Sequence, residues 1–196
     1  DGVIVPGGFG DRGIEGMITS AKYCREHNKP YFGICLGMQI AVIEFARNVL
    51  GFADATSREF DPASQHKVID IMEDQVGYEN TGGTMRLGAY ECKITPDTTL
   101  EKCYGKGVQS ITERHRHRYE FNNAMREPMT AAGLTLCGQS PNGSLVEAVE
   151  ITDKLFYVGV QYHPEFKSRP ANPHPVFREF IAASKAFKAA RGKSAK

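Results

Sequence analysis

The first fifty residues alternate between apolar runs of strand length and stretches with helical spacing. Val3–Val5 and Tyr31–Ile34 have the length and composition of buried strands, and helices are expected at Ile14–Glu26 and from Leu36 to near Gly51. Consecutive strand–helix units form parallel strands joined by right-handed crossovers. We therefore expect an α/β fold with a mostly parallel central sheet flanked by helices.

The middle of the chain has a different texture. Between residues 60 and 111 the apolar segments become short and alternating, at 68–71 and 85–94, and glycines punctuate them. These segments predict hairpins or an additional, smaller sheet that is mixed or antiparallel. Three further strands are expected at 134–137, 145–151 and 155–162, followed by a helix entered at Pro175.

Length and charge exclude several classes of protein. The chain has 196 residues, which suits one domain at about 150 residues per domain, and its net charge is +1. Five basic residues lie in the last twelve positions, so 185–196 is expected to be a solvated basic tail and the remainder is mildly acidic. Such a body lacks the electrostatic footprint of a nucleic-acid-binding domain.

No segment approaches the roughly 20 consecutive apolar residues of a membrane span, and no charged-then-apolar leader precedes the first strand. The five cysteines are an odd number without a C-x-x-C spacing, which favours a reducing compartment, the cytoplasm, without disulfides or structural zinc. The chain begins on a strand without an initiator methionine. We expect either a fragment or a first strand at the edge of the sheet.

A glycine-rich turn follows the first strand. Residues 8–13 spell G-x-G-x-x-G, the dinucleotide-binding fingerprint. That fingerprint also needs an acidic residue about 20 positions later, where this chain has residues 33–35, Gly-Ile-Cys, and no Walker Lys-Ser/Thr follows either. Two interpretations remain: a tight turn, or backbone N–H groups that face an anion formed during a reaction. A neighbouring nucleophile would favour the second.

Cys35 is the candidate nucleophile. It lies in Gly33-Ile-Cys-Leu-Gly37, a G-x-nucleophile-x-G pattern at a strand-to-helix junction, which exposes the side chain at the carboxyl end of a parallel sheet. The start of the following helix is expected to lower the pKa of the thiol. The other four cysteines are expected to be small core residues.

His163 is the candidate base. It follows the strand expected at 155–162, and residues i and i+2 on extended backbone point the same way, so Glu165 can reach its ring. Pro164 cannot continue a ladder and places the pair at a strand end. Glu165 would hold the ring in one orientation and leave its other nitrogen for Cys35.

The remaining histidines are expected to have no catalytic role. His27, His66 and His174 are predicted to face solvent. His115 and His117 lie in Arg-His-Arg-His-Arg, a cationic run in which the three arginines make metal binding unfavourable. The sequence therefore predicts no metal site.

Two blocks of sequence, 33–39 and 163–165, resemble the signatures of the class I (triad) glutamine amidotransferases, and 6–10 is similar to their oxyanion strand. Within that family, segments 82–88, 113–120 and 161–166 resemble the glutaminase domains of the CTP synthases. The resemblance runs from Asp1 to about Ile181.

The resemblance implies a reaction and a set of site residues. Cys35, His163 and Glu165 would form the catalytic triad that hydrolyses L-glutamine to glutamate through a γ-glutamyl thioester. Glu59 suits the ammonium group of glutamine, while Gln39 and Arg118 would help position the rest. The full set expected to contact glutamine or the oxyanion is Gly8, Phe9, Leu36, Gly37, Met38, Gln39, Glu59, Arg118 and Tyr119.

The resemblance also implies partners. Residues 1–184 would be the glutaminase domain, without a cofactor of its own, and upstream strands and an N-terminal synthetase domain would be absent. In the family that domain receives the ammonia and uses ATP and Mg²⁺ to convert UTP to CTP, with GTP as activator. The full-length enzyme would be a homo-oligomer, a tetramer. Residues 84–88 would be structural or would face the missing domain.

Two alternatives remain. The chain could be another class I amidotransferase or a γ-glutamyl hydrolase, against which the Arg-His run and the segment 84–87 argue. It could also be a non-catalytic nucleotide-binding module that keeps the fold. The presence together of Cys35, His163 and Glu165 argues against such a module.

Overall fold

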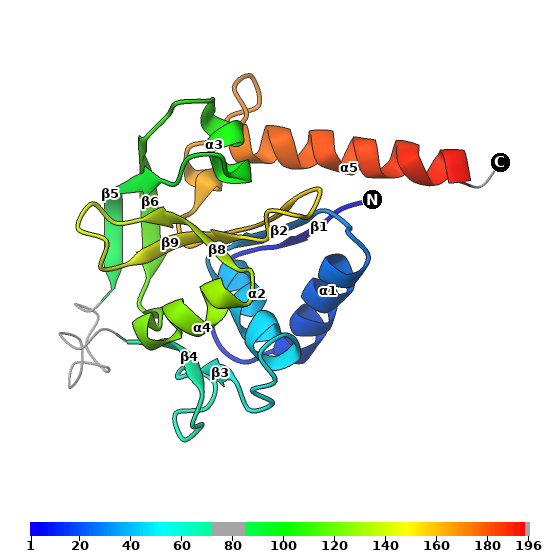
Figure 1. The fold of residues 1–196 in the computed structure, drawn as a ribbon. Helices are drawn as coiled ribbons and strands as arrows, with labels where there is room; N and C mark the ends of the chain where they lie inside the picture. The colour runs from blue at the N-terminus through cyan, green and yellow to red at the C-terminus, as the bar shows by residue number, and fades with distance from the viewer. Residues whose placement is uncertain (72–84, 195–196) are drawn as a thin grey trace.

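The computed structural model describes residues 1–71 and 85–194, and its centre is a sheet of seven strands (Figure 1). Across the sheet the strands follow the order β1 (Val3–Val5), β2 (Tyr31–Ile34), β10 (Tyr157–Val160), β9 (Val146–Glu150), β8 (Thr135–Gln139), β5 (Arg86–Ile94) and β6 (Ser110–His117). The first strand therefore lies at one edge, while the last strand in sequence lies near the middle.

The sheet is less parallel than expected. The α/β class with flanking helices is confirmed, but only β1–β2 and β2–β10 pair in parallel, and the other four neighbouring pairs are antiparallel. A parallel connection needs a crossover, which α1 (Ile14–Glu26) supplies between β1 and β2. The short loops from β8 to β9 and from β9 to β10 can only reverse the chain, so these strands run antiparallel.

Helices cover both faces of the sheet. In Figure 1, α1 and α2 (Leu36–Asn48) lie on one face, and α3 (Thr99–Tyr104) and α5 (Pro175–Ser194) lie on the other. Successive residues of β2 point to opposite faces. Tyr31 accordingly packs into the core under α1 and α2, and Phe32 packs into the second core beneath α5.

A second, smaller sheet lies beside the first. It contains β3 (Thr56–Ser57), β4 (Lys67–Asp70) and β7 (Glu120–Phe121), and it is mixed, which confirms the expected class of sheet. Of the two segments assigned to it, only the first belongs there, because β5 joins the large sheet through a long antiparallel pairing with β6. The remaining elements are η3 (Asn123–Met125), α4 (Arg126–Ala131) and η4 (Pro164–Phe166).

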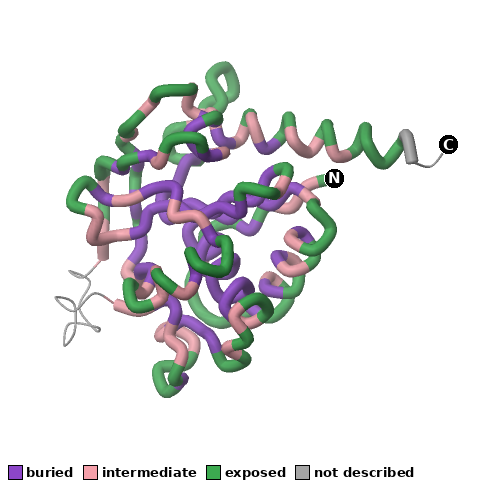
Figure 2. The backbone as a smooth tube through the Cα atoms, in the orientation of Figure 1, coloured by how far each residue is buried: buried purple, intermediate pink, exposed green. Residues whose placement is uncertain are grey.

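Burial follows these layers, and the far end of α5 extends beyond them (Figure 2). The described part of the basic segment is a continuation of α5, with Lys185, Lys188 and Arg191 exposed. All five cysteines are buried and free. Within residues 1–71 and 85–194, no helix is long and apolar enough to cross a membrane, and no cluster of three metal-ligating side chains is present.

Candidate active site

Cys35 lies on a strained turn between β2 and α2. Its backbone has φ 52° and ψ −102°, in the positive-φ region that residues with a side chain seldom adopt. The N–H of Cys35 donates to the carbonyl oxygen of Val160 on β10 at 2.7 Å, which fixes the turn against the neighbouring strand. The turn therefore presents the thiol at the carboxyl end of two parallel strands, as the sequence pattern predicts.

Glycines allow the start of α2 to approach the sheet. A Cβ at Gly37 would lie 2.1 Å from the carbonyl oxygen of Val5, and a Cβ at Gly33 would lie 2.4 Å from the carbonyl carbon and oxygen of Gly37. At Gly159 a Cβ would lie 3.0 Å from the Cα of Met38. Contacts this short leave room only for hydrogen. Glycine at these three positions therefore allows the start of α2 to lie directly against the sheet.

The thiol of Cys35 is less acidic than the sequence predicts. Burial raises its pKa to about 12, and the N–H of Leu36 at the start of α2 opposes this effect only in part. The helix start lowers the pKa as expected, but the loss of water has the larger effect, so the net shift is upward. A thiol of this kind is protonated at neutral pH, so its use as a nucleophile requires a base.

His163 lies beside this thiol. A Cβ at Gly7 would meet both groups, at 2.8 Å from Cε1 of His163 and 3.6 Å from Cβ of Cys35. Nδ1 of His163 is 2.6 Å from Oε1 of Glu165, the predicted pair, although the 3-10 turn η4 and not extended backbone brings the two side chains together. The ring of Phe166 stacks on the imidazole at 4.8 Å. Nε2 is buried and has no hydrogen-bond partner among the described residues, which leaves it able to take a proton.

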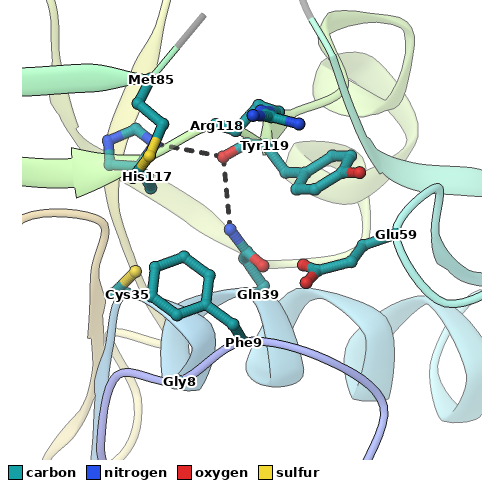
Figure 3. Close-up of a pocket in the computed structure, with 9 residues that line it drawn as sticks. All are labelled: Gly8, Phe9, Cys35, Gln39, Glu59, Met85, His117, Arg118 and Tyr119. Carbon is teal, nitrogen blue, oxygen red and sulfur yellow. Dashed lines mark hydrogen bonds between the residues drawn. The ribbon is translucent and has the colours of Figure 1, made fainter. Parts of the chain in front are cut away.

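A pocket of about 250 Å³ opens above Cys35 (Figure 3). One wall comes from the glycine-rich turn and α2, and the opposite wall comes from the end of β6 and the residues that follow it. The lining residues are Gly8, Phe9, Cys35, Gln39, Glu59, Met85, His117, Arg118 and Tyr119.

The structure brings most of the predicted site residues together. The glycine turn, Gln39, Glu59, Arg118 and Tyr119 all line the pocket. Leu36, Gly37 and Met38 do not line it and lie in the first turn of α2, where Met38 is buried in the core. The contacts of all these residues with glutamine stay predictions. Within segment 82–88, residues 82–84 lie outside the described residues.

Opposite charges line this pocket. The Glu59 carboxylate accepts a hydrogen bond from the N–H of Gly10 at 2.9 Å, which anchors it beside the glycine turn. Arg118 lies on the opposite wall (Figure 3). A pocket with one carboxylate and one guanidinium is complementary to a small zwitterion.

Sequence reasoning missed Met85 and His117, which also line the pocket. The available signal was the alternation of β6: because i and i+2 share a face, His115 and His117 point inward. Both rings are buried, which lowers the pKa of His115 to about 2 and that of His117 to about 3. The predicted cationic run therefore contains two neutral histidines.

The carbonyl oxygen of Tyr119 fixes the direction of several hydrogen bonds. It can only accept, and it lies 3.3 Å from Nε2 of Gln39 and 3.2 Å from Nδ1 of His117 (Figure 3). The neutral ring of His117 therefore carries its proton on Nδ1, and its Nε2 accepts from Nδ1 of His115 at 2.8 Å.

A buried charged group stands behind this wall, and we call it the Arg86 cluster: Arg86, His115, His117, Glu120 and Glu147. Arg86 donates to both carboxylate oxygens of Glu147, at 3.0 and 2.6 Å, and lies 3.7 Å from Glu120. Burial raises the pKa of Glu120 well above its usual range, and it raises that of Glu147 as well, although the hydrogen bonds from Arg86 oppose the second shift.

The other three histidines differ in how far they are buried. His27 is exposed and His66 is half-buried, paired with Asp54. His174 was predicted to face solvent and is instead buried, with Nε2 3.1 Å from Oε1 of Glu113. The prediction failed because Glu113 lies on the distant strand β6 and supplies a partner that local sequence does not reveal.

Comparison with known proteins gives one family. The model of the class-I glutamine amidotransferases matches residues 1–183. A CTP synthase of Carboxydothermus hydrogenoformans is 58% identical over 184 residues, 94% of this chain and 34% of the relative. One from Clostridium acetobutylicum is 59% identical over 181 residues, 92% of this chain and 34% of the relative. The chain spans about a third of the length of these relatives.

A solved structure agrees with these relatives. It is the Trypanosoma brucei CTPS glutaminase domain with bound acivicin, 44% identical with a TM-score of 0.89. The match covers 95% of this chain and 71% of that one.

Proposed function

The chain belongs to the class-I glutamine amidotransferase family, and on that premise we propose that it is the glutaminase part of a CTP synthase. It hydrolyses L-glutamine to glutamate and ammonia. One observation carries the proposal: the Cβ of Cys35 and the Glu165-bound ring of His163 both lie against Gly7, and Cys35 lines a pocket that holds charges of both signs.

The chemistry begins with removal of the thiol proton. Nε2 of His163 takes this proton as sulfur attacks the side-chain amide carbon of glutamine. Negative charge then develops on the amide oxygen, where the N–H of Leu36 and one from Gly8 or Phe9 stabilise it by about 3 kcal/mol each. This step needs a base in any case, because burial keeps the thiol of Cys35 protonated.

The intermediate then collapses. The imidazolium of His163 protonates the departing nitrogen, ammonia leaves, and a γ-glutamyl thioester remains on Cys35. His163 next removes a proton from water as it attacks the thioester, and the sulfur leaves and recovers its proton. The sum is glutamine plus water giving glutamate plus ammonia. Glu165 keeps the ring oriented throughout.

Glutamine is oriented by its charged end. We assign its ammonium group to Glu59 and its carboxylate to Arg118, with Gln39 helping to position the rest. The two charged side chains line opposite walls of the pocket, which supports this direction (Figure 3).

The ammonia has a destination outside this chain. We propose that residues 1–184 work with an N-terminal synthetase domain of the same polypeptide, which uses ATP and Mg²⁺ to aminate UTP to CTP and responds to GTP. The chain's span of about a third of its relatives supports this division. The full enzyme would be a homotetramer, and five free thiols support a reducing compartment, the cytoplasm.

The test uses a glutamine-analogue electrophile and locates the adduct by mass spectrometry. We expect labelling on Cys35, and Cys35→Ala should lower glutamate release at least about a thousandfold with its melting temperature retained. Cys24→Ala is the matched control, since Cys24 is a buried thiol on α1 away from the pocket, and it should keep its activity. Labelling elsewhere, or activity retained without the Cys35 thiol, would refute the mechanism.

The alternatives are less favoured. A γ-glutamyl hydrolase or another amidotransferase would not account for the high identity with CTP synthases, and a nucleotide-binding module would not need the thiol and imidazole together. Calorimetry separates the last alternative, because such a module should bind a nucleotide tightly without turning over glutamine.

A further inference from the structure

Gln161 follows β10 and lies deep in the site. The backbone bends at Gln161 and Tyr162. The side chain of Tyr162 packs in the second core, where its hydroxyl lies 3.0 Å from that of Tyr104. Gln161 is completely buried, and its amide Nε2 lies 3.6 Å from Sγ of Cys35.

Residues across the pocket determine which end of the Gln161 amide faces the sulfur. The carbonyl oxygen of Tyr119 can only accept, so Gln39 must turn its NH₂ group toward it. The same NH₂ group reaches Oε1 of Gln161 at 3.2 Å. With its oxygen held there, Gln161 can turn only its own NH₂ group toward the sulfur.

We propose that Gln161 is a further catalytic residue, whose side-chain amide donates a hydrogen bond to Sγ of Cys35 while Gln39 and the Tyr119 carbonyl hold it in that orientation. The role rests on the proposed glutaminase function. Charge on sulfur grows as His163 takes the thiol proton and again when sulfur leaves the thioester. A fixed neutral donor at that atom lowers the barrier of both steps without itself exchanging a proton.

A purely structural role makes the opposite prediction. If Gln161 only filled a buried polar position, its loss would loosen the core around Cys35 and expose the thiol. Alkylation of Cys35 would then become faster or stay unchanged. If Gln161 instead stabilises charge on the sulfur, its loss makes alkylation slower, because less of the thiol is then in the reactive thiolate form.

The experiment therefore measures alkylation of Cys35 by iodoacetamide at about pH 8 in the absence of glutamine, with the site verified by mass spectrometry. Gln161→Met removes the donor at nearly constant volume. We expect the rate to fall about threefold, since about tenfold less thiolate is partly offset by the greater nucleophilicity of a more basic sulfur. Gln39→Met, which frees the amide of Gln161, should give a smaller fall.

Gln109→Met is the matched control, because the side chain of Gln109 is exposed and its backbone carbonyl accepts a hydrogen bond from the N–H of Ile94. It should alkylate at the parent rate. In glutamine turnover, Gln161→Met should lower kcat about tenfold with KM changed less than twofold. An unchanged or faster alkylation in both Gln161→Met and Gln39→Met would overturn the proposal. Because alkylation needs no glutamine, this outcome is separate from failure of the glutaminase function.

Discussion

The two walls of the pocket are held in place by different physical means. On the wall that carries Cys35, β2 and α2 meet through backbone contacts at Gly33 and Gly37, closer than any side chain would allow. On the opposite wall, the Arg86 cluster ties β5 and β6 to β9, because the largely buried guanidinium of Arg86 pairs with the fully buried carboxylate of Glu147. The first wall depends on shape and the second on charge balance.

The difference has a chemical logic. The proposed chemistry requires the thiol and its base to be positioned relative to each other to better than about 1 Å, and backbone contact provides that rigidity. The opposite wall must supply polar groups such as the Tyr119 carbonyl, and buried polar groups are stable only with partners. Each wall should therefore fail in its own way when it is changed.

The largest effect is expected at Gly37. Gly37→Ala puts a methyl group 2.1 Å from the carbonyl oxygen of Val5, so α2 must move away from the sheet. We expect a loss of about 5 kcal/mol or more in the free energy of unfolding, comparable with the whole stability of a small domain. Urea denaturation followed by circular dichroism measures it.

Gly16→Ala is the control for this substitution. Gly16 is exposed in α1, and an added Cβ there would meet nothing within 4 Å. Because alanine favours a helix over glycine, this variant should be more stable by about 0.5–1 kcal/mol. Equal unfolding midpoints for the two variants would show that backbone contact does not hold this wall.

The charge-balanced wall is tested at Arg86. Arg86→Met leaves the buried carboxylate of Glu147 without its partner, and we expect a loss of about 3–5 kcal/mol in the free energy of unfolding. The double variant Arg86→Met/Glu147→Met removes both charges and should recover most of that loss. Arg178→Met, at an exposed ion pair, should change stability by less than about 1 kcal/mol. A double variant no better than the single one would contradict control by charge balance.

The smallest effect concerns pH and the thiol of Cys35. Its pKa is raised by burial to about 12, above the value of about 8.5 in an unfolded chain, so the folded state binds more protons above that value. This contribution to stability is therefore lost as pH rises from about 8.5 to about 12. When the pH rises from 8 to 9.5, the free energy of unfolding should fall by about 1 kcal/mol less in Cys35→Ala than in the parent chain. Parallel pH curves for the two proteins would show that the thiol does not titrate on unfolding.

Local sequence patterns predicted the wall that depends on shape. The glycines around Cys35, the strand–helix alternation and the spacing of His163 and Glu165 are all short-range features, and the structure reproduces their geometry. The charge-balanced wall depends on partners that are distant in sequence, such as Glu147 for Arg86. Residues on a half-buried strand can be assigned to a face, but their neutral or charged state depends on burial that no local pattern contains. For the same reason the acidity of Cys35 was predicted with the wrong sign.

The central place of β10 in the large sheet has a consequence for biosynthesis. β10 leaves the ribosome after the other six strands of this sheet, yet it inserts between β2 and β9, and it leads directly to Gln161 and His163. A nascent chain can complete α2 and its thiol while the base is still unmade. Because a contact across more than a hundred residues forms late in folding, the thiol and the imidazole come together only after β10 has entered the sheet. The order of strands thus keeps the thiol of Cys35 apart from the imidazole of His163 until β10 has been made.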